Sequence, residues 1–154
     1  VAILNNGRLQ QIASPEVAYS QPANQFVAGF IGSPSMNFLD CTVTNGSVET
    51  GGFSLDAPEE VESGSTLGVR PENISLGFGN EGQTQASVTV FEQVGSFNIV
   101  YLDIDGVDDV VAQVAGKEQF DPGDDVSVKI DTNRIHLFGE DGGTVHNPPV
   151  FTKG

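Results

Sequence analysis

The stretch that decides the fold is Ala86-Ser87-Val88-Thr89-Val90-Phe91-Glu92-Gln93, followed after Gly95 by a second run from Asn98 to Ile104. Val, Ile, Phe, Tyr and Thr are frequent in both runs, and these residues favour β-strands. Asp105-Gly106 then predicts a turn toward a third run, Val110–Val114. Short β-type runs separated by turn residues indicate a mainly β protein.

The same alternation extends to both sides of this stretch. Asn45-Gly46 and Pro122-Gly123-Asp124 are turn signals between further β-type runs. These runs cover residues 38–44, 47–49, 66–70, 73–76, 126–130 and 135–138. Together they make eight or nine short strands. Their spacing of about 8–12 residues predicts a β-sandwich or a small β-barrel.

The chain opens with a different pattern. Asn5-Asn6-Gly7 predicts a hairpin turn between the strands Val1–Leu4 and Arg8–Ile12. A lone two-stranded hairpin is only marginally stable in water. Because the hairpin lacks its natural sheet neighbours, we expect this chain to be a piece of a longer protein.

Two short helices are expected next. Ser14-Pro15-Glu16 has the N-cap, the proline and the acidic residue that are typical of a helix start. Pro22 ends this helix, and Gly32 and Pro34 end the second one. The second helix carries one apolar stripe, formed by Phe26, Val27, Phe30 and Ile31. This stripe packs either on the chain's own barrel or on a domain that is missing here.

Composition restricts the function classes. The 154 residues fit one compact domain, with or without an appendage. They contain 6 Lys and Arg against 21 Asp and Glu, for a net charge of −15. Nucleic-acid binding is excluded because it needs clustered basic residues. Cys41 is the single cysteine, so no internal disulfide can form and a reducing compartment is expected. No apolar run approaches the roughly 18 residues of a membrane helix.

Motifs for catalysis and for cofactor or metal binding are not supported. Gly77–Gly82 matches the GxGxxG pattern of dinucleotide sites, but β-type residues follow it instead of the required helix. The acidic run from Asp103 to Asp109 lacks the glycine and glutamate positions of a helix-loop-helix calcium site. His136 and His146 have no cysteine near them in the sequence. Since there is also no Walker A run and no GxSxG elbow, we expect no catalytic, cofactor or metal site in this chain.

Several segments, in order along nearly the whole chain, resemble one protein family. The first region includes Asn6-Gly7-Arg8-Leu9-Gln10-Gln11, Ser14-Pro15-Glu16, Tyr19, Pro22-Ala23-Asn24, Phe26–Pro34 and Met36-Asn37-Phe38-Leu39. The later segments are Leu67–Ile74, Glu92–Ser96 and His136–Gly142. This order is similar to a junction in the sugar-importer ABC ATPases of the maltose type. In that family it joins the nucleotide-binding domain to the C-terminal regulatory TOBE domain, which has an OB-like fold.

The resemblance implies a domain organisation. Residues 1–33 correspond to the end of the nucleotide-binding domain and its linker helices, residues 34–147 to an OB-like small β-barrel, and residues 148–154 to a frayed tail. The Walker A, signature and Walker B motifs and the catalytic histidine of the family lie upstream of this junction. ATP and Mg²⁺ therefore belong to the parent chain, and we expect this chain to be non-catalytic.

The resemblance also assigns roles to single residues. The family's Gly-x-Arg-Pro-Glu segment corresponds to Gly68, Arg70, Pro71 and Glu72, with a structural role in which Arg70 and Glu72 pair across a turn. A contact between two copies is expected at Gly95, Ser96, Phe97, Asn98 and Phe138, with filling of the barrel as the alternative for both phenylalanines. A contact with the missing ATPase domain is expected at Phe26, Phe30 and Ile31. Without that domain, we expect residues 1–33 to be mobile or docked on another copy.

The expected function is that of a regulatory and dimerisation domain in the ATP-binding subunit of a sugar ABC importer. Its expected partners are a second copy, the membrane subunits through the parent chain, and a regulatory protein that the resemblance allows. The expected location is the cytoplasm, at the inner face of the cell membrane. The alternative is a small-ligand module, because related barrels bind oxyanions such as molybdate. A net charge of −15 and only three arginines argue against capture of an anion.

The acidic residues are spread along the chain and lysine is rare, which indicates adaptation to a salt-rich cytoplasm such as that of haloarchaea. An ordinary acidic protein is the alternative. We expect the melting temperature to rise between about 0.1 M and 1 M KCl, because the Debye length shrinks from about 10 Å to about 3 Å and self-repulsion is screened. Thermal melts followed by circular dichroism measure this. A melting temperature that stays flat or falls over this range contradicts the salt adaptation.

Overall fold

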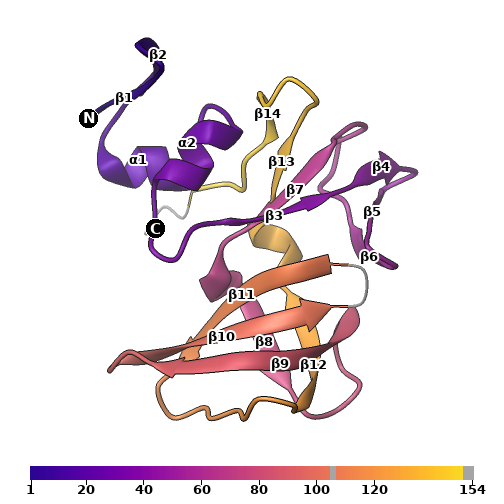
Figure 1. Cartoon of the computed structure of the whole chain (residues 1–154). Helices are drawn as coiled ribbons and strands as arrows, with labels where there is room; N and C mark the ends of the chain where they lie inside the picture. Colours follow the sequence, from indigo (N-terminus) through magenta and orange to yellow (C-terminus); the bar gives the residue numbers. More distant parts are fainter. Residues whose placement is uncertain (105–106, 151–154) are drawn as a thin grey trace.

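The computed structural model of the chain describes residues 1–104 and 107–150, and nearly half of these residues lie in strands (Figure 1). The expected turn at Asp105-Gly106 lies outside the described residues. A hairpin and two short helices come first, and β-strands with two 3-10 turns follow from residue 37 onward. The prediction of a mainly β protein is confirmed, as are the expected hairpin and helices.

A five-stranded antiparallel sheet forms the lower half of the molecule in Figure 1. Its strands are β8 (Ile74–Gly77), β9 (Thr84–Gln93), β10 (Phe97–Ile104), β11 (Val107–Ala115) and β12 (Asp125–Ile130). They are paired in the order β11-β10-β9-β12-β8. The outer strands β11 and β8 also contact each other, so the sheet curls into a nearly closed barrel, as the OB-like expectation requires.

Two smaller sheets cover one end of this barrel. The first consists of β3 (Asn37–Asp40), β7 (Thr66–Val69), β13 (His136–Phe138) and β14 (Thr144–His146). The second consists of β4 (Thr42–Thr44), β5 (Ser47–Thr50) and β6 (Phe53–Asp56). The described residues from 37 onward thus contain twelve strands, more than the eight or nine expected.

The extra strands have local causes. The run 38–44 is divided at Cys41, whose N–H donates to the carbonyl of Ser65 at 3.0 Å and so extends the pairing of β3 with β7, while β4 from Thr42 onward pairs with β5 in the other sheet. The strands β6 and β14 are only three or four residues long and follow glycine-rich turns. Such short segments show too little alternation of apolar and polar residues to be recognised from sequence alone.

The main core fills the barrel and the sheets above it. Its buried apolar side chains come from residues between Leu39 and Leu137, and none of them lies in the first 33 residues. Strand β10 shows the alternation that builds this core, because Val100 and Leu102 point inward while Ile99 and Tyr101 point outward and are half-buried. Burial of one face of each strand is the main stabilising contribution to this part of the fold.

The first 31 residues build a small unit with a core of its own. Strands β1 (Ala2–Asn5) and β2 (Arg8–Ile12) are joined by a tight turn in which Asn6 and Gly7 both have positive φ, as hairpin turns require. Helices α1 (Pro15–Ser20) and α2 (Gln25–Phe30) follow. Their core consists of the buried residues Ile3, Ala18 and Val27. Among the described residues, no helix is long and apolar enough to cross a membrane.

Both helices begin at the caps that the sequence indicates. The side chain of Ser14 accepts a hydrogen bond from the N–H of Val17 at 3.2 Å, and Asn24 caps α2 through the N–H of Val27 at 3.0 Å. These bonds satisfy N–H groups that have no partner inside the helix.

A third cluster joins the two units. Ala28 of α2 packs against Met36 and Phe138, and all three are buried. Gly68 of β7 lies beneath this cluster, since a Cβ atom added at Gly68 would lie 2.5 Å from Met36 Sδ and 2.8 Å from the ring of Phe138. The close approach of backbone and side chains therefore requires glycine at this position.

We expect Gly68→Ala to lower the free energy of unfolding by about 1–3 kcal/mol, because the new methyl group overpacks the cluster around Phe138. Urea denaturation followed by circular dichroism measures this. Gly79→Ala is the matched control, since a Cβ there meets no atom within 4 Å. Equal effects of the two substitutions would contradict the packing explanation.

Candidate functional site

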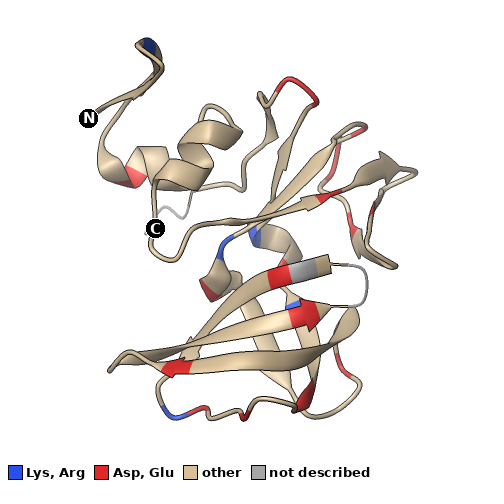
Figure 2. Ribbon diagram, in the orientation of Figure 1, with Lys and Arg blue, Asp and Glu red and all other residues tan. Residues whose placement is uncertain are grey.

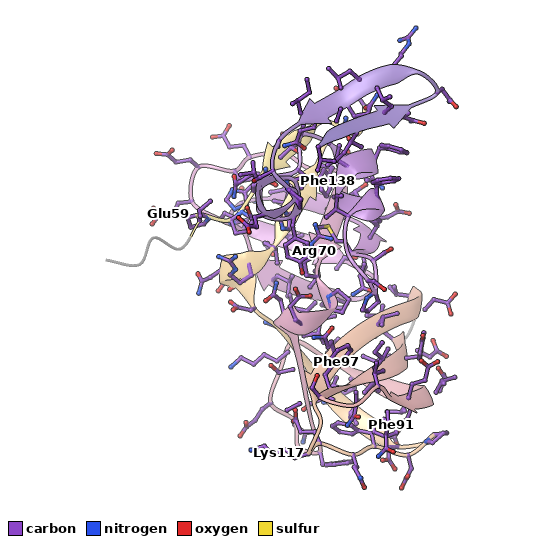
Figure 3. The ribbon with its side chains drawn as sticks, turned by 90° about the vertical axis from the view of Figure 1, so that its left-hand side faces the viewer. Glu59, Arg70, Phe91, Phe97, Lys117 and Phe138 are labelled. Carbon is purple, nitrogen blue, oxygen red and sulfur yellow. The ribbon has the colours of Figure 1, made fainter. Side chains whose placement is uncertain are left out.

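Arg70 occupies the junction between the helices and the barrel. It follows β7 and precedes the 3-10 turn η1 (Pro71–Asn73), and its side chain is only 2% exposed. Figure 3 shows it in the interior, between the upper part of the molecule and the barrel. A fully buried guanidinium is rare in proteins and must be satisfied by nearby polar groups.

Backbone carbonyls accept hydrogen bonds from both Nη atoms of the Arg70 side chain. Nη1 donates to the carbonyls of Ala28 and Ile31 at 3.0 and 2.7 Å, and Nη2 donates to the carbonyl of Tyr19 at 2.8 Å. These carbonyls lie at the C-terminal ends of α2 and α1, where they lack partners within the helix and where the helix dipole favours a cation. One side chain from the β part therefore caps both helices.

Tyr19 links Arg70 to Glu72. The guanidinium carbon of Arg70 lies 4.0 Å from the centre of the Tyr19 ring, a cation–π contact. The Tyr19 hydroxyl donates a hydrogen bond to the Glu72 carboxylate. The tyrosine thus takes the place of the direct pair that we expected between Arg70 and Glu72. The main contribution of Arg70 is its bonding to the helix ends.

The burial of Arg70 is not fully compensated. Its Nε has no hydrogen-bond partner among the described residues. Desolvation lowers the pKa of Arg70 to about 10, so the group still carries its charge at neutral pH. Pro71 is buried as the first residue of η1, and the N–H of Asn73 donates to the Arg70 carbonyl at 2.9 Å. This turn holds the arginine backbone in place.

Two of the residues expected at a contact between copies are buried. Phe138 is fully buried against Ala28 and Met36, so its ring belongs to the interior. Asn98 is 1% exposed, and its Nδ2 donates to the Glu118 carbonyl at 2.7 Å as well as to two neighbouring carbonyls. The burial of Phe138 agrees with the alternative that it fills the interior, and the burial of Asn98 corrects the sequence-based expectation, which could not tell which face of a strand meets the core.

The remaining residues of that expectation lie at the surface. Gly95 and Ser96 are exposed in the turn between β9 and β10, and Phe97 is half-buried at the start of β10. Phe97 shares the outer face of the sheet with four apolar residues that the expectation did not include. We name this set the outer stripe, and it consists of Val90, Phe97, Ile99, Tyr101 and Val111. The register pairs Tyr101 with both Val90 and Val111, so the stripe crosses three strands.

Of the residues expected to face the ATPase domain, Phe30 is the most exposed at 62%. Phe26 stacks on Phe30 with ring centres 5.9 Å apart, while Phe26 and Ile31 also pack on the small core below. A hollow of about 480 Å³ lies at this surface. Its lining consists of Gln25, Phe26, Gly29, Phe30 and Phe38.

The sequence analysis missed further apolar residues in this segment. The exposed residues are Val1, Leu4, Leu9, Ile12 and Val17. With Phe30 they are six of the twelve large apolar side chains exposed in the described part of the chain. Leu4 and Leu9 face each other in the hairpin register, which brings apolar residues of the two strands together.

The segment is also almost free of charge. The charged residues of segment 1–33 are Arg8 and Glu16, and their charges cancel. The whole net charge of −15 is therefore carried by the rest of the chain. Figure 2 shows the hairpin and helices in tan apart from these two residues, whereas acidic residues mark the loops elsewhere. The acidity is therefore less evenly spread than we expected from the composition.

Residues 1–33 nevertheless dock on the chain's own β part. The N–H of Gln25 donates to the Gly142 carbonyl at 2.8 Å, and the Thr144 hydroxyl donates to the Pro22 carbonyl at 2.7 Å. The tail takes part as well, since Gln21 Nε2 donates to the Pro148 carbonyl at 2.7 Å. The segment thus has a defined place on the barrel, and the expected fraying is not observed at Pro148. Residues 151–154 of the expected tail lie outside the described residues.

No catalytic or metal-binding arrangement emerges in the described residues. No group of three or more His, Cys, Asp or Glu side chains among them can hold a metal ion. The glycine-rich loop after β8 leads into strand β9, as the sequence indicated. Of the acidic run, Asp105 and Gly106 lie outside the described residues. Cys41 is buried, and burial raises the pKa of its thiol to about 11, so the thiol form predominates at neutral pH.

The comparison with known families agrees with this geometry. Residues 67–138 match the TOBE domain profile, and residues 32–74 match the profile of the MalK OB fold domain. Together these regions extend from Gly32, before β3, to the end of β13 and include Arg70. The chain carries a TOBE domain of the MalK type.

Two ATP-binding proteins of sugar importers are similar to this chain over almost its whole length. The xylose/arabinose import ATP-binding protein XacK of Haloferax volcanii is 37% identical over 96% of this chain. The trehalose/maltose import ATP-binding protein MalK of Thermococcus litoralis is 38% identical over 93% of it. The chain spans only 42% and 43% of the length of these two relatives.

A solved structure has the same fold as the TOBE domain. The cytoplasmic molybdate-binding protein ModG superposes with a TM-score of 0.52 at 16% sequence identity, covering 73% of this chain and 96% of that protein. At this identity the similarity concerns the fold alone, and it agrees with the expected OB-like barrel.

His136 in the TOBE domain provides a test of the packing. It is buried, its Nδ1 lies 2.8 Å from Asn147 Oδ1, and desolvation lowers its pKa to about 4. Because the unfolded state binds the proton near pH 6.5, the free energy of unfolding should fall as the pH drops from 6.5 to 4. The loss attributable to His136 is on the order of 3 kcal/mol.

Urea denaturation at pH 7, 5.5 and 4 measures this loss. His136→Gln should remove most of the extra pH dependence in this window, while the carboxylates titrate equally in both proteins. His146→Gln is the control for the second, less buried histidine. An unchanged pH dependence in His136→Gln would contradict the assignment to His136.

Proposed function

We propose that the chain is the non-catalytic regulatory part of an ABC importer's ATP-binding subunit, and that the importer carries a sugar. The observation that supports this most directly is that two sugar-import ATP-binding proteins match more than nine-tenths of the chain, including its TOBE domain. In this proposal, ATP and Mg²⁺ bind the part of the subunit that the relatives possess in addition. The subunit works in the cytoplasm, against membrane subunits at the inner face of the cell membrane.

The surface of residues 1–33 supports a contact with that additional part. In a chain of charge −15, a surface with only two charged residues that exposes Phe30 and Ile12 is unusual. Acidic residues keep a protein soluble, whereas a permanent contact requires apolar area. We therefore assign Phe26, Phe30, Ile31 and the outer face of the hairpin to the contact with the ATP-binding domain. The lack of charge on this surface argues that protein rather than solvent covers it.

A contact between two copies is assigned to the outer stripe and the adjacent turn. Two chains of charge −15 repel each other, so they can meet only where charge is sparse and apolar area is available. The stripe offers Ile99, Tyr101 and Phe97 next to the exposed Gly95 and Ser96. Phe138 and Asn98 are no longer part of this contact.

Sedimentation equilibrium in 1 M KCl tests this contact, with calorimetric titration of ATP as a second measurement. We expect the chain to associate reversibly and Tyr101→Glu to weaken that association by at least about tenfold, because a charge is placed between Val90 and Val111 at the centre of the apolar contact. We expect no saturable ATP binding. Val145→Glu is the matched control, since Val145 is also an exposed strand residue but lies on β14.

Three outcomes would contradict the proposal in different parts. A chain that stays monomeric up to millimolar concentration, or equal effects of the two glutamate substitutions, would refute the contact between copies. Saturable ATP binding would refute the non-catalytic role.

The alternative function is binding of an oxyanion such as molybdate. The similarity to ModG concerns the fold alone and gives this alternative little support. Arg70 cannot serve as the anion ligand in this structure, because it is buried and donates to three carbonyls. A rise of the melting temperature with micromolar molybdate, absent with equal chloride, would favour this alternative.

A further inference from the structure

We propose that helices α1 and α2 leave the barrel as one unit while the barrel stays folded, and that Arg70 is the residue that controls this release. The proposal concerns the chain alone and holds whichever partner covers residues 1–33. It rests on how the apolar cores are divided and on how Arg70 is bonded.

The apolar cores are divided at the junction. The large core contains only residues from Leu39 to Leu137, and the small core of the first unit is built around Ile3, Ala18 and Val27. Among the buried clusters of the described residues, only that of Ala28, Met36 and Phe138 contains residues from both sides. Units with separate cores and a small shared cluster are expected to open separately, at a lower free energy than global unfolding.

The remaining contacts across the junction are mostly polar. Gln21, Gln25 and Thr144 form hydrogen bonds that involve a backbone group of the opposite side. Water can replace such bonds after release, so each of them contributes little net stability. The helices have only six residues each and are too short to be stable without docking. Loss of docking is therefore expected to unfold both helices together.

Arg70 is a side chain of the β part that bonds both helices at once. It supplies three hydrogen bonds from a charged group and one cation–π contact, all to residues of the first unit. The docked state also keeps this guanidinium away from water and leaves its Nε without a partner. Release hydrates the whole group, which offsets part of the bonding that is lost. This balance makes the junction able to open and close without disturbing the barrel.

Amide hydrogen exchange of the 154-residue chain, measured by NMR at several low urea concentrations, tests the proposal. The helix probes are the amides of Ala18, Ala28 and Ile31, and the barrel probes are those of Val100 and Leu102. After correction for intrinsic rates, we expect the helix probes to exchange at least about tenfold faster than the barrel probes. They should also share one urea dependence, smaller than that of the barrel.

Arg70→Lys should raise exchange of the helix probes by at least a further tenfold or so, because lysine cannot bond both helix ends at once. The barrel probes should change by less than about twofold. Arg8→Lys is the matched control, because Arg8 is exposed at the hairpin turn of the same unit. Tyr19→Phe removes only the hydroxyl contact with Glu72, and it should produce a smaller rise confined to the same probes.

Two results would overturn the proposal. One is that helix and barrel probes share the same rate and the same urea dependence in the unmodified chain. The other is that Arg70→Lys raises exchange of both sets by the same factor. If Arg70→Lys does not fold, the same comparison in Tyr19→Phe decides, since a rise in both sets contradicts separate release and a rise in the helix probes alone supports it.

Discussion

The docking of the two helices on the barrel depends on one buried cation that is bonded to backbone rather than to acid. Arg70 emerges from the end of β7 and reaches the C-terminal ends of two helices that come earlier in the chain. A helix end normally needs a glycine, a basic residue of its own last turn, or water to satisfy its carbonyls. Neither α1 nor α2 has a basic residue in its last turn, so Arg70 supplies the charge for both.

Several neighbouring features follow from the placement of this arginine. Gly68 has no side chain, which allows Met36 and Phe138 to pack tightly beside β7. Pro71 and the 3-10 turn hold the backbone where the arginine leaves the strand. Arg70 itself lies among the causes that lower the pKa of His136, although desolvation is the largest of them. The junction is thus a region where charge is tolerated because carbonyl dipoles, rather than carboxylates, surround it.

Sequence patterns predicted the fold class and the strands of the barrel well, because alternating apolar residues specify one buried face. They indicated a structural role for Arg70 but not its partners, which are backbone carbonyls 39 to 51 residues away and carry no side-chain identity. They left Phe138 open between the interior and a contact and misplaced Asn98, since a residue at a strand end can face either the core or solvent. The apolar surface of the hairpin was missed because Leu4 and Leu9 become neighbours only when the register is known.

The way Arg70 is bonded also affects where this module can be cut and joined during evolution. The family boundary suggested by sequence lies near residue 34, but the carbonyls that receive the arginine lie before it. A barrel transferred to another protein at that boundary would carry a guanidinium suited to helix ends that the new host does not supply. It would also expose Met36 and Phe138, which α2 covers here. The unit that can be inherited intact therefore includes both helices, beginning with the cap at Ser14.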